Sequence, residues 1–250
     1  VQDENTSKKY ENKAALWRIN DTLGFYRTCP VTTDRYVIAV SYSGRIICAD
    51  KRTGVAVQSI NASEYGGAAS GLVMSGGRIY YSTASGYVCS VPVGDGGLDI
   101  SGFYCEKVGG YCGAAPLIYN GRLYQAESDT PAEAGYPNGR GPFGIRVYDI
   151  KENSLSYAYR AATEGQINTA LSMTDAYGDA HIYYTVVKTA GTRIMMMTDR
   201  PGMTSESPEN GCIYSETAAV GDGAAGAVVS DETGNLYVKL LGGGIVSIGR

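Results

Sequence analysis

The sequence contains few of the residues on which most catalytic and metal sites depend. Its 250 residues include one histidine, one tryptophan and three phenylalanines. A Ser-His-Asp triad would have to use His181, and no Gly-x-Ser-x-Gly motif accompanies it. One histidine and no Cys-x-x-Cys pair argue against a transition-metal site. We therefore expect no catalytic residue of these kinds, no metal and no cofactor.

Charge and hydropathy exclude two further classes of partner. The 21 basic and 25 acidic residues give a formal net charge of -4. Such a chain lacks the basic surface that a phosphate backbone requires. No apolar run approaches the ~18 residues of a membrane-spanning helix. We expect no nucleic-acid partner, no membrane span and a monomeric protein.

The six cysteines leave their pairing open. Cys48 and Cys89 occupy matching places in two apolar segments, where we expect buried thiols that behave as small hydrophobes. Cys105 and Cys112 flank Gly109-Gly110, so a disulfide that closes this short loop is the alternative to free thiols.

What the chain does have is glycine and tyrosine, 34 and 21 residues, which suit the turns and strands of an all-β fold. A pattern of an apolar strand, a turn, a second strand, a glycine and a third strand recurs five times. The first strands of the five repeats begin at Val31, Gly71, Ala115, Thr169 and Gly226. Their spacing, roughly 40 to 60 residues, is typical of propeller blades.

Several of these strands are apolar on both faces. Residues 37–40 and 194–197 show no alternation with polar residues, which indicates burial on two sides. Gly76-Gly77 and Asn120-Gly121 provide tight turns between first and second strands. Weaker fourth strands follow the third ones. The sequence therefore predicts an all-β, five-bladed β-propeller with four antiparallel strands per blade.

The fifth repeat has no fourth strand, because the sequence ends at Arg250 just after its third strand. An apolar segment, residues 14–19, precedes the first repeat. We predict that this segment closes the last blade and removes its free edge. Residues 1–13 are then a flexible polar lead-in, and residues 14–250 form one domain.

The segment Cys48-Ala49-Asp50-Lys51-Arg52-Thr53-Gly54, followed by Gln58, resembles the repeat of quinoprotein-like (PQQ-like) β-propellers, whose pattern is Ala-x-Asp-x-x-Thr-Gly-x-x-x-Trp. Asp50, Thr53 and Gly54 match this pattern, whereas Gln58 replaces the tryptophan. The third repeat matches less closely and the fourth keeps only Asp199 of it. Trp17 is similar to the docking tryptophan of a closing blade.

The resemblance implies a fold rather than an activity. Enzymes of that family have eight blades and hold their quinone with a tryptophan floor, a Ca²⁺ site and a catalytic aspartate, and this sequence has no such set of residues. Non-catalytic relatives are secreted or envelope-bound scaffolds and binding modules. The resemblance therefore implies an extracytoplasmic protein that is secreted, on the cell surface or anchored to the envelope.

Ring closure would bring the segments that enter each blade together around one mouth of the channel. They carry aromatic, amide and acidic side chains that suit a glycan or peptide ligand: Tyr65, Tyr111, Gln166, Asn168 and Asp222. The alternative is that small residues occur there only because strands converge. A long loop in the third repeat presents a second surface with Tyr136, Arg140 and Phe143.

The predicted function is a non-enzymatic binding or scaffold module that recognises a glycan or a protein partner. A first alternative is a secreted glycoside hydrolase, which needs paired carboxylates near the channel axis. The candidate carboxylates are Asp34, Glu64, Glu127, Asp129, Glu164 and Asp175. A second alternative is a structural spacer in a larger surface protein.

Overall fold

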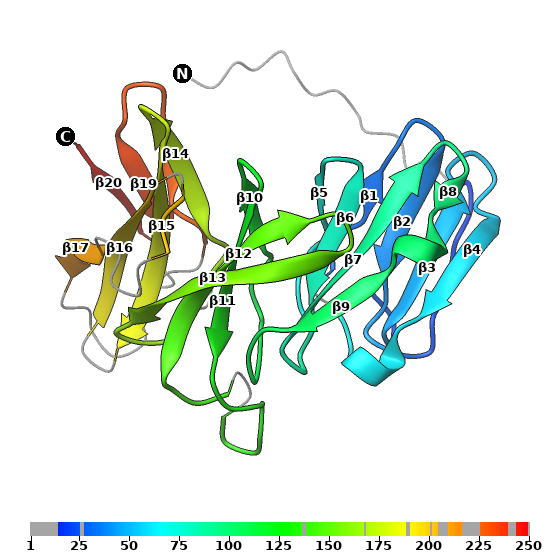
Figure 1. The fold of residues 1–250 in the computed structure, drawn as a ribbon, viewed down its shortest axis with the longest axis horizontal. Helices are drawn as coiled ribbons and strands as arrows, with labels where there is room; N and C mark the ends of the chain where they lie inside the picture. The colour runs from blue at the N-terminus through cyan, green and yellow to red at the C-terminus, as the bar shows by residue number, and fades with distance from the viewer. Residues whose placement is uncertain are drawn as a thin grey trace, which may run out of the picture.

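The protein is an array of five antiparallel β-sheets. The computed structural model describes residues 15–25, 28–136, 139–167, 169–188, 191–200, 202–204, 210–216, 226–239 and 244–249. Figure 1 shows the sheets following one another in chain order along an arc, with the first and fifth sheets at its two ends. No helix in these ranges is long and apolar enough to cross a bilayer.

Each of the first two sheets carries its strands in chain order from one edge to the other. The first sheet contains β1 (Val31–Thr32), β2 (Tyr36–Val40), β3 (Arg45–Asp50) and β4 (Ala56–Asn61). The second contains β5 (Val73–Ser75), β6 (Arg78–Ser82), β7 (Tyr87–Gly94) and β8 (Gly97–Leu98), and β9 (Tyr104–Lys107) also pairs with β7. Short 3₁₀ helices lie at Ser63–Tyr65 and Ile100–Gly102.

The other three sheets repeat this plan. The third contains β10 (Leu117–Tyr119), β11 (Arg122–Ser128), β12 (Phe143–Lys151) and β13 (Ser154–Thr163). The fourth contains β14 (Ser172–Ala176), β15 (Asp179–Lys188), β16 (Gly191–Asp199) and β17 (Asn210–Glu216). The fifth contains β18 (Val229–Ser230), β19 (Leu236–Lys239) and β20 (Ile245–Ile248).

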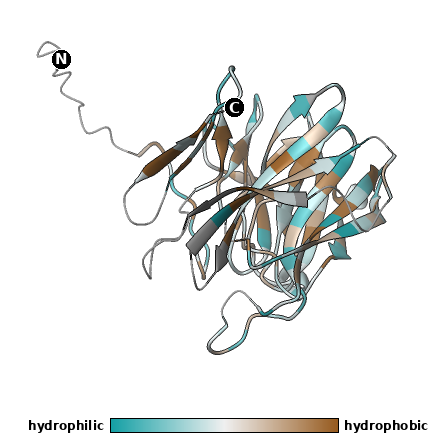
Figure 2. Ribbon diagram, turned by 90° about the vertical axis from the view of Figure 1, so that its left-hand side faces the viewer, coloured by the Kyte–Doolittle hydropathy of each residue, from teal (hydrophilic) through white to brown (hydrophobic). Residues whose placement is uncertain are grey.

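The sheets pack face to face, and the hydrophobic core is divided among the interfaces between neighbours. Tyr80 and Tyr81 are both buried and face opposite ways, because Tyr81 packs toward the first sheet and Tyr80 toward the third. Further buried clusters join the third sheet to the fourth and the fourth to the fifth. Figure 2 shows hydrophobic residues concentrated along the strands. The predicted two-sided burial is confirmed for residues 194–197, where Ile194 packs toward the fifth sheet and Met195 and Met197 toward the third. It is wrong for residues 37–40, because only Ile38 and Val40 are buried and the other two residues are half-buried.

The turn between β3 and β4 has the structure that its sequence pattern indicates. Oδ1 of Asp50 accepts hydrogen bonds from the backbone N–H groups of Arg52 and Thr53, at 3.0 and 3.1 Å. Gly54 follows with φ +72°, a left-handed conformation that glycine adopts without strain. The Asp–turn–Gly pattern therefore serves the backbone rather than a ligand.

Polar contacts between neighbouring sheets follow one pattern, in which a residue of one sheet bonds to the next sheet along the chain. The first residue of the second strand in one sheet reaches the last residue of the third strand of the next sheet or the turn that follows that strand. These contacts are Tyr36 Oη to Asp95 O at 3.1 Å, Arg78 Nη1 to Asn153 Oδ1 at 3.1 Å, and Arg122 Nη1 to Asp199 Oδ1 at 2.7 Å. We call them the inter-sheet bonds.

Gln58, which occupies the tryptophan position of the repeat, also joins two sheets. Its side-chain Oε1 accepts from Leu98 N at 2.7 Å, and its Nε2 donates to Leu98 O at 3.0 Å. The amide thus acts like one more strand residue against β8. The sequence did not predict the β7–β8 hairpin that makes this contact.

The predicted strand at residues 14–19 is corrected by the structure. Residues 15–20 form no strand, and β20 is paired only with β19 in the described part of the chain. Trp17 instead contacts the first sheet, where its ring lies against Gly54 and its Nε1 donates to Lys51 O at 3.0 Å. The segment makes hydrogen bonds to that sheet but adds no strand to the fifth.

The cysteine prediction is partly wrong. Cys48 is a buried free thiol as expected, and burial raises its pKa. Cys89 instead forms a disulfide with Cys105 across the paired strands β7 and β9, where the two residues are direct partners. Cys112 is buried and unpaired, so the Cys105–Cys112 alternative does not occur. Sequence spacing suggested a local loop, whereas strand register sets the actual pair.

Candidate functional site

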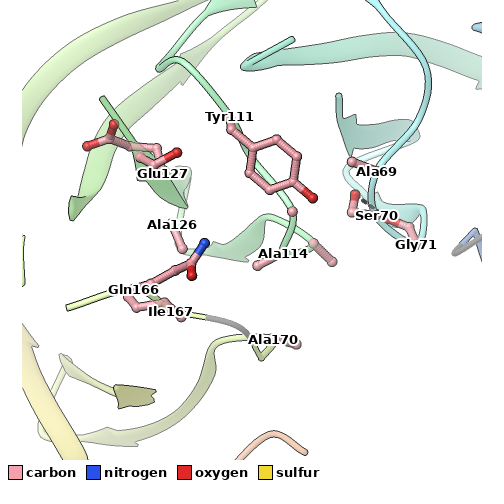
Figure 3. A pocket seen from close by; sticks show the side chains of 13 residues that line it. Ala69, Ser70, Gly71, Tyr111, Ala114, Ala126, Glu127, Gln166, Ile167 and Ala170 are labelled. Carbon is pink, nitrogen blue, oxygen red and sulfur yellow. Dashed lines mark hydrogen bonds between the residues drawn. The ribbon is translucent and has the colours of Figure 1, made fainter. Parts of the chain in front are cut away.

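A cavity of about 500 Å³ opens where the second, third and fourth sheets converge. Its walls come from the segments that lead into β5, β10 and β14, together with the end of β11. Figure 3 shows Tyr111 and Gln166 on two sides of this space, with Ser70 and Gly71 across from the tyrosine. The cavity therefore draws on the segments predicted to surround a channel mouth.

Tyr111 forms one wall and is held firmly. Its backbone N–H donates to Ser128 O at 3.3 Å, and Ser128 N donates back to Tyr111 O at 3.0 Å. Gly113 lies against the ring, where an added Cβ would come within 2.7 Å of Cε1. The hydroxyl points toward Ser70 (Figure 3). Tyr111 thus presents an aromatic ring with a polar end at a fixed place.

Gln166 lies between β13 and β14 and brings an amide to the same space. The next residue, Ile167, pairs with Val186 by an isolated bridge, which fixes the local backbone. Figure 3 shows the side chain directed toward Ala114 and Ala126. An amide offers both donors and an acceptor, the groups that bind sugar hydroxyls or peptide bonds.

Buried polar side chains hold the small residues of the cavity wall. Ser82 Oγ donates to Cys112 O at 3.0 Å and to Ala114 O at 2.9 Å. Gln125 Nε2 also donates to Ala114 O, at 3.0 Å. The glycines and alanines of this wall agree with the alternative given above, in which small residues occur there because the segments converge. Tyr111 and Gln166 lie in the space between these segments.

Glu127 contributes to the cavity wall, but its carboxylate points away from Tyr111 and Gln166 (Figure 3). The side chain is fully buried, and its Oε1 accepts from Arg160 Nε at 2.7 Å. Arg146 Nε lies farther off, 3.7 Å from the same oxygen. Burial raises the pKa of Glu127, and the two guanidinium groups oppose that shift.

The other predicted site residues are distributed differently. The placement of Tyr65 at the channel mouth is wrong, because its ring packs against Tyr87 and Phe103 between the first two sheets, with centroids 5.3 and 6.1 Å away. Asn168 and Asp222 lie outside the described residues.

The predicted loop surface lies beside the cavity. Tyr136 is exposed, and the guanidinium of Arg140 lies 3.9 Å from the centroid of its ring. Arg140 also forms an ion pair with Glu133. Phe143 is the first residue of β12 and is half-buried, so it belongs to the sheet rather than to the exposed loop tip.

Most of the candidate carboxylates have structural partners. Glu164 pairs with Arg193 at 2.6 Å, and Asp175 accepts from Tyr119 Oη at 2.6 Å. His181 lies 3.2 Å from Thr198 Oγ1. Among the described residues, no group of three or more His, Cys, Asp or Glu side chains is arranged to hold a metal.

Sequence reasoning missed the role of Glu127 in shaping the site, having treated it only as one of several carboxylates. One signal was available: Glu127 continues a strand whose other residues are buried, from Arg122 to Ser128. A carboxylate inside such a strand needs a cationic partner. The partners, Arg160 and Arg146, lie on two other strands and are identified only by the register of β11, β12 and β13.

Five stacked antiparallel sheets with a cavity at their convergence define a protein of the β-propeller type. No protein-family model and no curated protein sequence matches the chain. Among solved structures, the WD40 domain of Neurospora crassa Pan2 is similar, with a TM-score of 0.54 and 14% identity, over 84% of this chain and 58% of that domain. The chain therefore spans little more than half of that domain's length.

Two further structures match less closely. BamB from Moraxella catarrhalis has a TM-score of 0.45 and 12% identity, over 87% of this chain and 67% of BamB. The computationally designed Ika4 protein has a TM-score of 0.48 and 13% identity, over 73% of this chain and 98% of Ika4. At such identities the similarity concerns the fold.

Proposed function

We propose that the protein is a non-enzymatic binding module that holds a glycan in the cavity between its second, third and fourth sheets. The observation that carries this proposal is the placement of the Tyr111 ring and the Gln166 amide around one space of about 500 Å³. Aromatic rings pack against the apolar faces of sugars, and amides bind their hydroxyls. A protein partner at the same place is the other outcome of the test below.

The glycoside hydrolase alternative has less support. Hydrolysis needs two carboxyl groups that flank the scissile bond. The described lining of the cavity includes one carboxylate, Glu127, and it points away toward Arg160. The spacer alternative assigns no ligand to this cavity.

We also propose an extracytoplasmic location. The Cys89–Cys105 disulfide supports it, because such bonds persist in oxidising compartments and are rare in the cytosol. The quinoprotein-like repeat supports it as well, since Asp50 and Gly54 adopt the turn that this pattern predicts.

We further propose that the five sheets close into a ring of five blades. The inter-sheet bonds support closure, because each one ends on the last residue of the third strand of the next sheet or in the turn after it. The corresponding turn of the first sheet, Lys51 to Gly54, is contacted by Trp17. In a closed ring the first sheet, with residues 15–20 against it, would lie next to β20, which has no outer neighbour in the described part of the chain.

Thermal shift measurements with cellotetraose, chitotetraose and xylotetraose test the binding proposal. A ligand that binds only the native state raises stability by RT ln(1 + [L]/Kd), so a saturable rise in melting temperature supports a binding module. Tyr111→Phe and Gln166→Ala should reduce the rise, whereas Tyr177→Phe, a fully exposed tyrosine in another turn, should not. Release of reducing sugar would instead establish an enzyme. No shift with any glycan would contradict glycan binding and direct attention to protein partners.

A further inference from the structure

The described residues of the loop between β11 and β12, 129–136 and 139–142, project from the protein beside the cavity. Figures 1 and 2 show them extending away from the body of the protein, below the sheets. At its base, Asp129 N donates to Pro142 O at 3.1 Å, and Arg140 N donates to Thr130 Oγ1 at 2.6 Å. These bonds close the loop into a hairpin-like unit, described at residues 129–136 and 139–142.

The base of this loop and the wall of the cavity share backbone contacts. Gly110 N donates to Ser128 O at 2.8 Å, next to the paired backbones of Tyr111 and Ser128. Gly110 lies so close to the loop that an added Cβ would meet the carbonyl carbon of Thr130 at 2.1 Å. A displacement of the loop base therefore displaces Tyr111.

The side chain of Glu127 connects the same two parts from inside. Gly109 packs on it, where an added Cβ would lie 2.8 Å from the Cβ of Glu127. Arg160 donates through Nε to Glu127 Oε1 and through Nη2 to Pro142 O, the last carbonyl of the loop, at 2.7 and 3.2 Å. One guanidinium group thus joins the cavity wall to the end of the loop.

We propose that the loop and the cavity form a single binding surface for a linear oligosaccharide, and that Glu127 is the positioning residue that joins them through Arg160. This inference rests on the proposed function, because it takes the cavity as the binding site. The exposed Tyr136, with Arg140 over its ring, is the part of the loop that would contact sugar units outside the cavity. A chain of several units is therefore bound better than a single sugar.

Protonation of Glu127 weakens this connection, since the bond to Arg160 then loses one of its two charges. The ionisable groups around Glu127 are those of Arg160 on β13, Arg146 on β12, Asp129 in the loop and Cys112 before β10. The pKa of the carboxyl is raised by its burial, so the connection loosens at a higher pH than an exposed glutamate would require.

Hydrogen–deuterium exchange on the ligand-free protein tests the connection by itself. Glu127→Gln should increase exchange at residues 129–142 and 109–113 by roughly tenfold, as expected when a hydrogen bond between two charged groups loses one charge. Asp179→Asn, which removes a charge from the half-exposed pair with Arg200, is the matched control and should leave both segments unchanged. Arg160→Lys serves as a second variant, because the single nitrogen of lysine cannot take the places of both Nε and Nη2.

The pH dependence of exchange distinguishes an effect of the Glu127 charge from a purely structural role of its side chain. After correction for intrinsic rates, protection of residues 129–142 should fall with decreasing pH in the wild type and stay constant in the Glu127→Gln variant. Unchanged exchange in both the Glu127→Gln and Arg160→Lys variants would overturn the connection, whether or not any glycan binds.

The single surface has its own test. The test compares the binding of chitotetraose, cellotetraose and xylotetraose with that of the corresponding single sugars. Tyr136→Ala should reduce the affinity for a tetrasaccharide at least tenfold and leave the affinity for the single sugar unchanged. Equal affinity for one unit and for four would overturn the extended surface. Absence of binding by all these sugars would overturn the ligand class together with the proposed function, while the exchange result would still decide the role of Glu127.

Discussion

The buried carboxylate of Asp199 should be among the most sensitive positions for stability. It accepts hydrogen bonds from Arg122 Nη1, at 2.7 and 3.0 Å, and from Tyr124 Oη and Tyr159 Oη, at 2.5 and 2.7 Å. The side chains of Asp199 and Arg122 are 4% and 9% exposed. Asp199→Asn keeps the shape, removes the charge and presents an amide N–H to groups that are all donors.

The expected loss in the free energy of unfolding depends on the hydrogen bonds that Arg122 keeps in the variant. Removing one partner of a buried ion pair costs about 3–5 kcal/mol. Arg122 still donates to Asp149 Oδ1 and Met203 O, so we expect the lower end, about 3 kcal/mol. With a denaturant slope of roughly 3 kcal/mol/M, the urea midpoint should fall by about 1 M.

Urea unfolding followed by circular dichroism measures this change. Asp179→Asn is the control, because its pair with Arg200 is half-exposed and contributes about 0–1 kcal/mol. Equal midpoint shifts for the two variants would refute the assignment of Asp199 as the acceptor that joins the third and fourth sheets.

Three further predictions concern closure, the disulfide and alkaline pH. A Leu16→Cys, Ser247→Cys variant should form an intramolecular cross-link detectable by peptide mapping if the ring closes and brings residues 15–20 beside β20. Cross-links confined to dimers would contradict closure. Reduction of Cys89–Cys105, 16 residues apart, should cost about 3 kcal/mol, and an unchanged melting temperature in reductant would argue against this contribution. Burial raises the pKa of Tyr148 to about 12, compared with about 10 in the unfolded chain. Between these two pH values the unfolded state binds fewer protons than the folded state, so the free energy of unfolding should fall as the pH rises. A free energy of unfolding that stays constant over this range would contradict the burial of Tyr148.

Strand positions were largely predictable, since they depend on local patterns. The second strands at Tyr36–Val40 and Arg78–Ser82 agree with the expected bounds, because apolar runs between glycine turns mark them clearly. The first strand of the first sheet begins at Val31 as expected, whereas those of the other four sheets begin two or three residues later, as at Val73. The preceding residues enter the sheet as irregular segments, and their composition resembles that of a strand.

Contacts between distant segments were harder to predict. Tyr111 and Gln166 line one cavity as expected, because both lie in segments that enter neighbouring sheets. Tyr65 occupies a similar place in the sequence, yet its ring turns to the interface with Tyr87. Side-chain direction at such a position is set by packing partners, and the sequence does not show which ones are available.

The inter-sheet bonds have a consequence for how such a molecule grows. Each bond joins a sheet only to its successor, so every described interface is made by segments adjacent in the chain. Stability in arrays of this kind is close to a sum over units and their nearest-neighbour interfaces. Insertion or loss of one whole repeat would leave the other described interfaces intact. Besides apolar faces, a new unit would need a donor at the start of its second strand and an acceptor at the end of its third strand or in the turn that follows. The architecture can thus change length by duplication, one matched pair of groups at a time.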